Sequence, residues 1–311
     1  MSTLDLNCKL LCASEAAYCI LPKSKPGKYN PCDSHTSENI KNQYNAVGFT
    51  EDPYVCVNGE IEAALVGKTD YGIVVAFRGT LPPAWNVPAI LDWIENIFLA
   101  TPTGNIYLPG KVHSGFLLAV QLLEHQVINA IHCLDPYHKL PLYLTGHSKG
   151  GGMVPIAAHY FENKYNIHAT RTIRFAGPKP GNQDFADAFE AKFRYDVNFQ
   201  NYLDIVPLLA PSDDFIKLLL LIPGLSNRLR ELLIAASHWD YVNVGADAYI
   251  NSDGHLAAPP SIEDRIGEIF LKLMELDGAA IADAHHISCG PNATGRYRYM
   301  QGVCQGHVCK F

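Results

Sequence analysis

The chain has 311 residues, of which 48% are apolar and 18% are charged. This composition is typical of a globular protein and excludes a disordered one. The 24 Lys and Arg residues against 31 Asp and Glu residues give a formal net charge of −7, with no run of basic residues. The charge balance therefore argues against a protein that binds nucleic acid or an anionic membrane surface.

No stretch approaches the roughly 18–20 uninterrupted apolar residues that a transmembrane helix requires, so no transmembrane segment is predicted. The most apolar piece, residues 215–225, contains Lys217. At the N-terminus there is no basic region, and the apolar positions are interrupted by Asp5, Asn7 and Lys9. This segment is therefore not predicted to be a signal peptide.

The nine cysteines are concentrated near the two ends of the sequence, five before residue 60 and three after residue 288. This distribution favours a disulfide that joins the two ends of the chain. The odd number leaves at least one thiol free, and the pairing stays open.

Short β-rich runs alternate with helical stretches along the chain. The expected strands are Glu62–Val66, Tyr71–Phe77, Leu142–Thr145, Arg171–Ala176, Asn198–Leu203 and Asp240–Val244. Helices are expected at residues 4–20, 115–134 and 150–163. Because Tyr71–Phe77 is nearly all apolar, it is typical of a strand covered on both faces. The alternation predicts one α/β domain over residues 1–311, with a mostly parallel sheet flanked by helices.

The sharpest local motif is the G-x-S-x-G sequence from Gly146 to Gly150, with Ser148 at its centre. It follows a β run and precedes a helix. A serine on such a tight strand-to-helix turn projects above the sheet edge, and the helix directs its first N–H groups at any oxyanion that forms there. Ser148 is therefore a candidate nucleophile.

A serine nucleophile needs a base, and the base needs an orienting carboxylate. Asp204 follows a predicted strand directly and would lie at the same sheet edge as Ser148, whereas Asp213 and Asp214 are more typical of a helix start. The spacing does not choose among the histidines that follow. These are His238, His255, His285, His286 and His307.

Several motifs in a fixed order resemble the class 3 (fungal-type) lipase family of α/β-hydrolases. They are Ala16–Cys19, Val74–Thr80, Asp92–Trp93, Val112–Phe116, the serine motif, Phe175–Asn182, Leu203–Pro207 and a C-terminal histidine. The resemblance implies the α/β-hydrolase fold, with Ser148 as nucleophile and Asp204 as the orienting acid. In the family the base precedes a short segment resembling Ile287-Ser288, which favours His286, with the adjacent His285 as its rival and His255 behind both.

The resemblance also implies an oxyanion hole. Its donors would be the backbone N–H and hydroxyl of Thr80 and the backbone N–H of Lys149. The family usually has an apolar or uncharged residue at position 149. Only the backbone N–H is needed there, so the chemistry is expected to survive, and the lysine could pair with a nearby acid.

The segment after Thr80 lies where the family carries a lid over the serine. Its apolar set would cover the acyl site when closed and contact lipid when open. The residues assigned to this lid, about 81–91, are Leu81, Trp85, Val87, Ile90 and Leu91. The interval from Asp204 to His286 is longer than in compact fungal enzymes, which predicts a helical insert within residues 212–284.

Taken together, the motifs predict a serine carboxylic-ester hydrolase that acts on lipid esters at an oil–water interface, most simply a triacylglycerol lipase. Alternatives are a feruloyl esterase or phospholipase A1 of the same family, an amidase or peptidase, and a non-catalytic lipid-binding protein on this fold. Acyl transfer of this type needs no metal or organic cofactor. The family is often secreted, and localisation and oligomeric state stay open.

Overall fold

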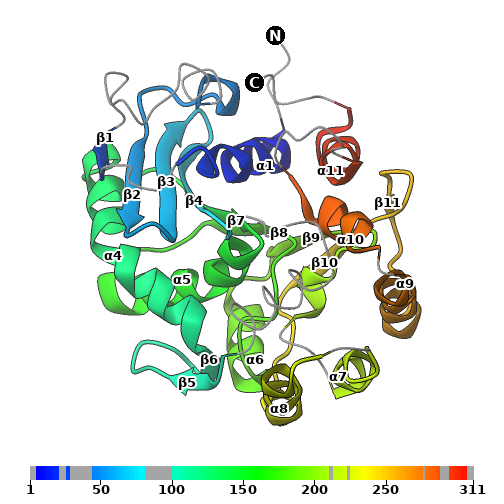
Figure 1. Ribbon diagram of the computed structural model, residues 1–311. Coiled ribbons are helices and arrows are strands. Elements are labelled where there is room, and N and C mark those ends of the chain that lie inside the picture. The colour runs from blue at the N-terminus through cyan, green and yellow to red at the C-terminus, as the bar shows by residue number, and fades with distance from the viewer. Residues whose placement is uncertain are drawn as a thin grey trace.

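The computed structural model describes residues 5–20, 26–28, 44–80, 100–209, 213–222, 225–275, 277–287 and 294–306. Its centre is one sheet in the order β1-β2-β3-β4-β7-β8-β9-β10-β11. Strands β4, β7, β8, β9 and β10 are parallel to one another, whereas β1–β3 and β11 pair antiparallel at the two edges. The predicted α/β fold with a central sheet flanked by helices is thereby confirmed (Figure 1).

The described strands include most of those predicted. Their bounds are β1 Gly27–Lys28, β2 Tyr54–Asn58, β3 Glu62–Thr69, β4 Gly72–Phe77, β5 Pro102–Gly104, β6 Lys111–His113, β7 Leu142–His147, β8 Arg171–Phe175, β9 Val197–Asn201, β10 Ala246–Ile250 and β11 Leu256–Ala257. The expected strand at Asp240–Val244 is wrong. Only Val242 makes an isolated bridge there, with Gly181, and the strand forms after the turn at Gly245, where φ is +68°.

The helices lie on both faces of the sheet. Their bounds are α1 Leu6–Ala17, α4 Ser114–Leu134, α5 Lys149–Tyr165, α6 Gln183–Lys192, α7 Asp213–Leu219, α8 Asn227–Ala236, α9 Ile262–Met274, α10 Gly278–His285 and α11 Thr294–Cys304, with a 3-10 turn η1 at Val206–Leu208. The three expected helices are α1, α4 and α5. The interval 212–284, where a helical insert is predicted, contains α7, α8 and α9, and also β10 and β11, which extend the sheet.

Alternate residues of β4 face two separate cores. Val75 and Phe77 pack in the cluster that contains α4 and α5, whereas Val74 and Ala76 pack in the cluster that contains α1 and α11. All six residues of β4 are buried, as expected for a strand covered on both faces. Burying apolar surface on both sides fixes the register of the sheet, because a one-residue slip would exchange the two faces.

Helix α4 is also long and apolar enough to cross a membrane by length and composition alone. However, 56% of its most apolar window is buried inside the fold. Its buried face packs on α5 and β3, which is the usual place of a core helix. Among the described residues no other helix meets this criterion.

The predicted link between the two ends of the chain is present. Cys8 of α1 and Cys304 of α11 form a disulfide across a sequence separation of 296 residues, and the two helices pack against each other beside the sheet (Figure 1). Cys56 and Cys133 are free thiols. Because the bridge closes nearly the whole chain, it removes a large amount of conformational freedom from the unfolded state.

We predict that the C8A/C304A variant loses about 2–4 kcal/mol of unfolding free energy, measured by urea denaturation under oxidising conditions. The matched control is C133A, which removes an exposed free thiol and is expected to leave the denaturation midpoint unchanged. An equal midpoint for C8A/C304A and the wild type would contradict a stabilising role for this bridge.

Candidate active site

Ser148 lies on a strained turn between β7 and α5. Its backbone has φ 59° and ψ −132°, a conformation that non-glycine residues rarely adopt. Gly150 makes the turn possible, because a Cβ there would overlap the carbonyl oxygen of Phe77. The Ser148 N–H donates to the carbonyl of Phe175 in β8, at 3.0 Å. The predicted serine motif therefore forms the strand–turn–helix geometry that raises the serine above the sheet.

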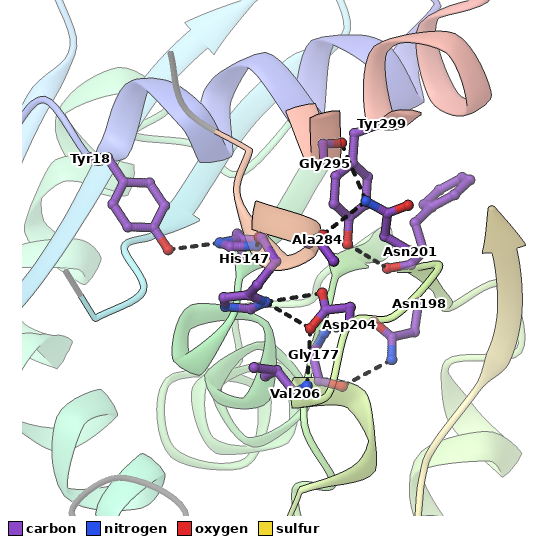
Figure 2. A network of polar contacts seen from close by, with 12 residues as sticks. Tyr18, His147, Gly177, Asn198, Asn201, Asp204, Val206, Ala284, Gly295 and Tyr299 are labelled. Atoms are coloured by element: carbon purple, nitrogen blue, oxygen red, sulfur yellow. Dashed lines mark hydrogen bonds and ion pairs between the residues drawn. The ribbon is translucent and has the colours of Figure 1, made fainter. Parts of the chain in front are cut away.

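Asp204 lies at the same end of the sheet, just after β9. Its carboxylate is fully buried, and Oδ1 accepts the N–H of Val206 at 3.0 Å. The Nδ1 atom of His285 lies 2.9 Å from Oδ1 and 3.0 Å from Oδ2 of Asp204. Figure 2 shows the Asp204 carboxylate and its contact with the N–H of Val206. A buried carboxylate is stable only when it is paired or hydrogen-bonded, and this one is both.

The prediction that His286 pairs with Asp204 is corrected by this geometry. His285 is the last residue of α10, whereas His286 has an extended backbone (φ −70°, ψ 135°) outside the helix. Because the helix ends between them, their side chains leave the backbone in different directions. Burial, and then the neighbouring His285, lower the pKa of His286 to about 4. His255 lies exposed in the turn between β10 and β11.

The end of α10 is held in place by Asn201, the last residue of β9. Its side-chain amide donates to the carbonyl of Ala284 at 2.9 Å and to that of Gly295 at 3.3 Å. Asp277 precedes the first residue of α10 and caps the helix, because its side chain accepts the N–H of Ala280. Asn201 thus connects the strand that leads to Asp204 with the helix that carries His285 (Figure 2).

A second chain of hydrogen bonds reaches His285 through the residue before the serine. Nε2 of His147 lies 2.8 Å from the backbone carbonyl of His285, and its Nδ1 lies 2.7 Å from the hydroxyl of Tyr18. A carbonyl only accepts, so Nε2 carries the proton and Nδ1 accepts from Tyr18. Burial, followed by the charges of His285 and His286, lowers the pKa of His147 well below its usual value. His147 therefore stays neutral. It connects the Tyr18 hydroxyl to the His285 carbonyl and does not act as a second base.

Tyr299 of α11 lies behind Asp204. Its ring is fully buried between His147 and Phe175, and its hydroxyl donates to the carbonyl of Phe199 at 3.5 Å. Burial, followed by the nearby Asp204 carboxylate, raises the pKa of Tyr299 well above its usual value. The phenol thus remains neutral and keeps its proton beside the carboxylate (Figure 2).

The two predicted oxyanion-hole residues lie on either side of the serine turn. Thr80 follows β4, and its Oγ1 is buried with no hydrogen-bond partner among the described residues. Lys149 is the first residue of α5, where backbone N–H groups have no partner within the helix. The Oγ of Ser148 is also buried without a partner among the described residues. These polar groups are available to a bound substrate.

The lid predicted at residues 81–91 lies outside the described residues, as do Asp92 and Trp93. No cluster of three His, Cys, Asp or Glu side chains with metal-binding geometry occurs in the described part of the chain.

Sequence reasoning missed three residues that build this site. Asn201 precedes Asp204 by only three residues. A side-chain amide at the end of the strand that leads to Asp204 is a signal in the sequence for a residue that positions neighbouring segments. Tyr18 belongs to the Ala16–Cys19 motif. The role of Tyr299 depends on how α11 packs, which no local pattern reveals.

Residues 74–213 match a family model described as Lipase (class 3). Phospholipase A1-II 1 of Oryza sativa subsp. indica is 28% identical over 178 residues, 50% of this chain and 43% of that protein. Secreted mono- and diacylglycerol lipase MDL5 of Malassezia globosa is 34% identical over 109 residues, 33% of this chain and 34% of that protein. The chain thus spans less than half the length of these curated relatives.

The crystal structure of M37 lipase superposes with a TM-score of 0.58 at 20% identity, covering 89% of this chain and 95% of that one. At this identity the likeness concerns the fold. The segment that matches the family model contains most of β4, the serine turn and Asp204. These are among the motifs that carry the resemblance in the sequence. Residues 74–213 are therefore similar to the class 3 lipase family, in agreement with the resemblance carried by the sequence motifs.

Proposed function

We propose that the protein is a serine carboxylic-ester hydrolase that acts on lipid esters, with Ser148 as nucleophile, His285 as base and Asp204 as orienting acid. The observation that carries the proposal is the buried Asp204–His285 pair at the same sheet end as the strained Ser148 turn. A carboxylate, an imidazole and a serine in this order along an α/β sheet are the parts that activate a hydroxyl for acyl transfer.

In the first step His285 Nε2 takes the proton from Ser148 Oγ as the oxygen attacks the ester carbonyl carbon. Asp204 holds the other ring nitrogen, Nδ1, and stabilises the imidazolium that forms. The carbonyl oxygen becomes an oxyanion facing the N–H groups of Thr80 and Lys149 and the Thr80 hydroxyl. The C–O bond to the alcohol then breaks, His285 protonates the alcohol, and the acyl group remains on Ser148.

The second step repeats the first with water as the nucleophile. His285 takes a proton from water, the hydroxide adds to the acyl carbon, and the same donors bind the oxyanion. Collapse of this intermediate returns the proton to Ser148 and releases the carboxylic acid. No metal or organic cofactor takes part in this sequence.

Triacylglycerol is the substrate we propose first. The sequence assigns an apolar lid to residues 81–91, and residues 74–213 match the family model of the class 3 lipases. Phospholipid is the second candidate, favoured by the similarity to a phospholipase A1 from rice. Both substrates present an acyl ester at a lipid–water interface and differ in the head group.

The substrate class is tested with tributyrin, carried through its solubility limit, and with phosphatidylcholine vesicles. We expect a jump in rate when tributyrin droplets appear, and loss of activity in S148A. Saturation below the limit would contradict a working lid, and faster release of fatty acid from phosphatidylcholine would make phospholipid the substrate. Equal rates for S148A and the wild type would contradict the proposed nucleophile.

The two adjacent histidines are separated by H285N and H286N. Removing the base is expected to lower kcat by about 10⁴-fold or more, and therefore H285N should be nearly inactive. H286N should retain activity within about tenfold. Because the pKa of His286 is lowered to about 4, this residue gains a proton only in acid, and H286N should leave the pH–rate profile between about pH 5 and 8 unchanged. A shifted acid limb in H286N, with an active H285N, would reverse the assignment.

Thr80 is tested by T80V and T80S. Loss of one oxyanion donor lowers kcat by about 10²–10³-fold. Because the backbone N–H of residue 80 remains in T80V, the loss of kcat is expected at the lower end of this range. T80S keeps the hydroxyl and should stay close to the wild type. Equal kcat for T80V and T80S on a soluble ester would show that the hydroxyl takes no part.

A further inference from the structure

Lys149, the residue after the proposed nucleophile, forms an ion pair with Glu62 at the start of β3. Its Nζ lies 2.7 Å from both carboxylate oxygens of Glu62. The two side chains are only 9% and 14% exposed. An ion pair in which one ammonium contacts both carboxylate oxygens and which is largely removed from water is only weakly screened by salt.

The Glu62 end of this pair belongs to the segment that holds Arg78. The Arg78 N–H donates to the carbonyl of Ala63 at 2.9 Å. Its guanidinium donates to the carbonyls of Ile61 at 2.8 Å and Glu60 at 3.0 Å. Thr80 follows two residues later. The position of residues 60–63 therefore determines where the first proposed oxyanion donor lies.

The Lys149 end of the pair belongs to the turn that carries the second donor. The two segments meet backbone to backbone. A Cβ at Gly79 would overlap the carbonyl of His147 and the Cβ of Ser148, and a Cβ at Gly150 would overlap the carbonyl of Phe77. The Tyr18 hydroxyl also lies against Gly79. The two segments are therefore closely packed, and an ion pair between their side chains adds to the contacts that hold them together.

We propose that the Glu62–Lys149 ion pair is a positioning device for the oxyanion hole. It joins the strand segment that fixes Arg78 and Thr80 to the first residue of α5, and so sets the distance between the two N–H donors. This inference rests on the proposed ester hydrolysis. Lys149 thus acts in two ways, through its backbone as a donor and through its side chain as an anchor.

The pair also controls charge beside the oxyanion. With Lys149 present, the negative charge of Glu62 is neutralised. In K149M the Glu62 carboxylate would lose the Lys149 cation and keep only the nearby Arg78 guanidinium, so more of its negative charge would oppose the developing oxyanion. In E62Q the cation remains, and the amide oxygen still accepts a hydrogen bond from Nζ. The account therefore predicts that K149M is impaired more strongly than E62Q.

The test uses the full chain and p-nitrophenyl butyrate below its solubility limit, so that lid opening at an interface does not contribute. We expect kcat to fall about 10–100-fold in K149M, up to the range for loss of one oxyanion donor, and about 3–10-fold in E62Q. KM should change by less than about twofold. K149R, which can still bind both carboxylate oxygens, should recover most of kcat.

A second readout is the rate at which a p-nitrophenyl alkylphosphonate modifies Ser148. The phosphoryl oxygen of this probe occupies the oxyanion hole, so its reaction rate should fall in parallel with kcat across K149M, E62Q and K149R. A merely structural role would lower the amount of folded protein and leave the rate constant of the folded fraction unchanged.

The matched control is the ion pair between Lys164, on the same helix α5 as Lys149, and Glu124 of α4, in which Nζ lies 2.9 Å from both carboxylate oxygens. K164M should lower thermal stability and leave kcat unchanged. If K149M behaves like K164M, with normal kcat and normal phosphonylation, the positioning role is overturned. A wild type that neither hydrolyses esters nor reacts with the phosphonate would instead overturn the proposed function, and with it this role.

Discussion

The hydrogen bond between the buried Asp204 carboxylate and the His285 ring is the interaction on which the rest of the site depends. A carboxylate without solvent is costly unless its oxygens are satisfied, and here the His285 ring and the Val206 N–H satisfy them. The contact requires the end of β9 and the end of α10 to meet. The Asn201 amide contributes to this by donating to the carbonyl of Ala284 at the end of α10 and to that of Gly295 in α11.

The sheet gives the site its rigidity. Each proposed functional group follows the carboxyl end of a parallel strand or a helix packed upon it: Thr80 after β4, Ser148 after β7 and Asp204 after β9. Two apolar cores hold these strands from both sides, so strain at the serine turn is supported by packing elsewhere. The buried chain from Tyr18 through His147 to His285 then ties α1 to the base.

Sequence patterns predicted the parts of this fold that carry local signals. These parts are the apolar run of β4, the serine between two glycines and the strand before Asp204. Each is marked by an apolar run next to residues typical of a turn, and the structure contains all three elements. The sequence favours His286 over His285 as the base, whereas the ring that contacts Asp204 belongs to His285. The two residues are adjacent, and only the end of α10 decides which ring reaches the carboxylate. Likewise, Glu62, the partner of Lys149, lies 87 residues away on β3. Because no sequence motif covers both residues, their pairing could not be predicted.

The measurement that tests the central claim most directly is covalent labelling of the protein with a p-nitrophenyl phosphate triester, followed by peptide mass spectrometry. The probe reacts only with a serine whose proton is removed by a positioned base. The account predicts one modified residue, Ser148, with the modification almost absent from D204N at equal folded content. Labelling of another serine, or equal labelling of Ser148 in D204N, would contradict the claim that the buried Asp204–His285 pair activates this serine.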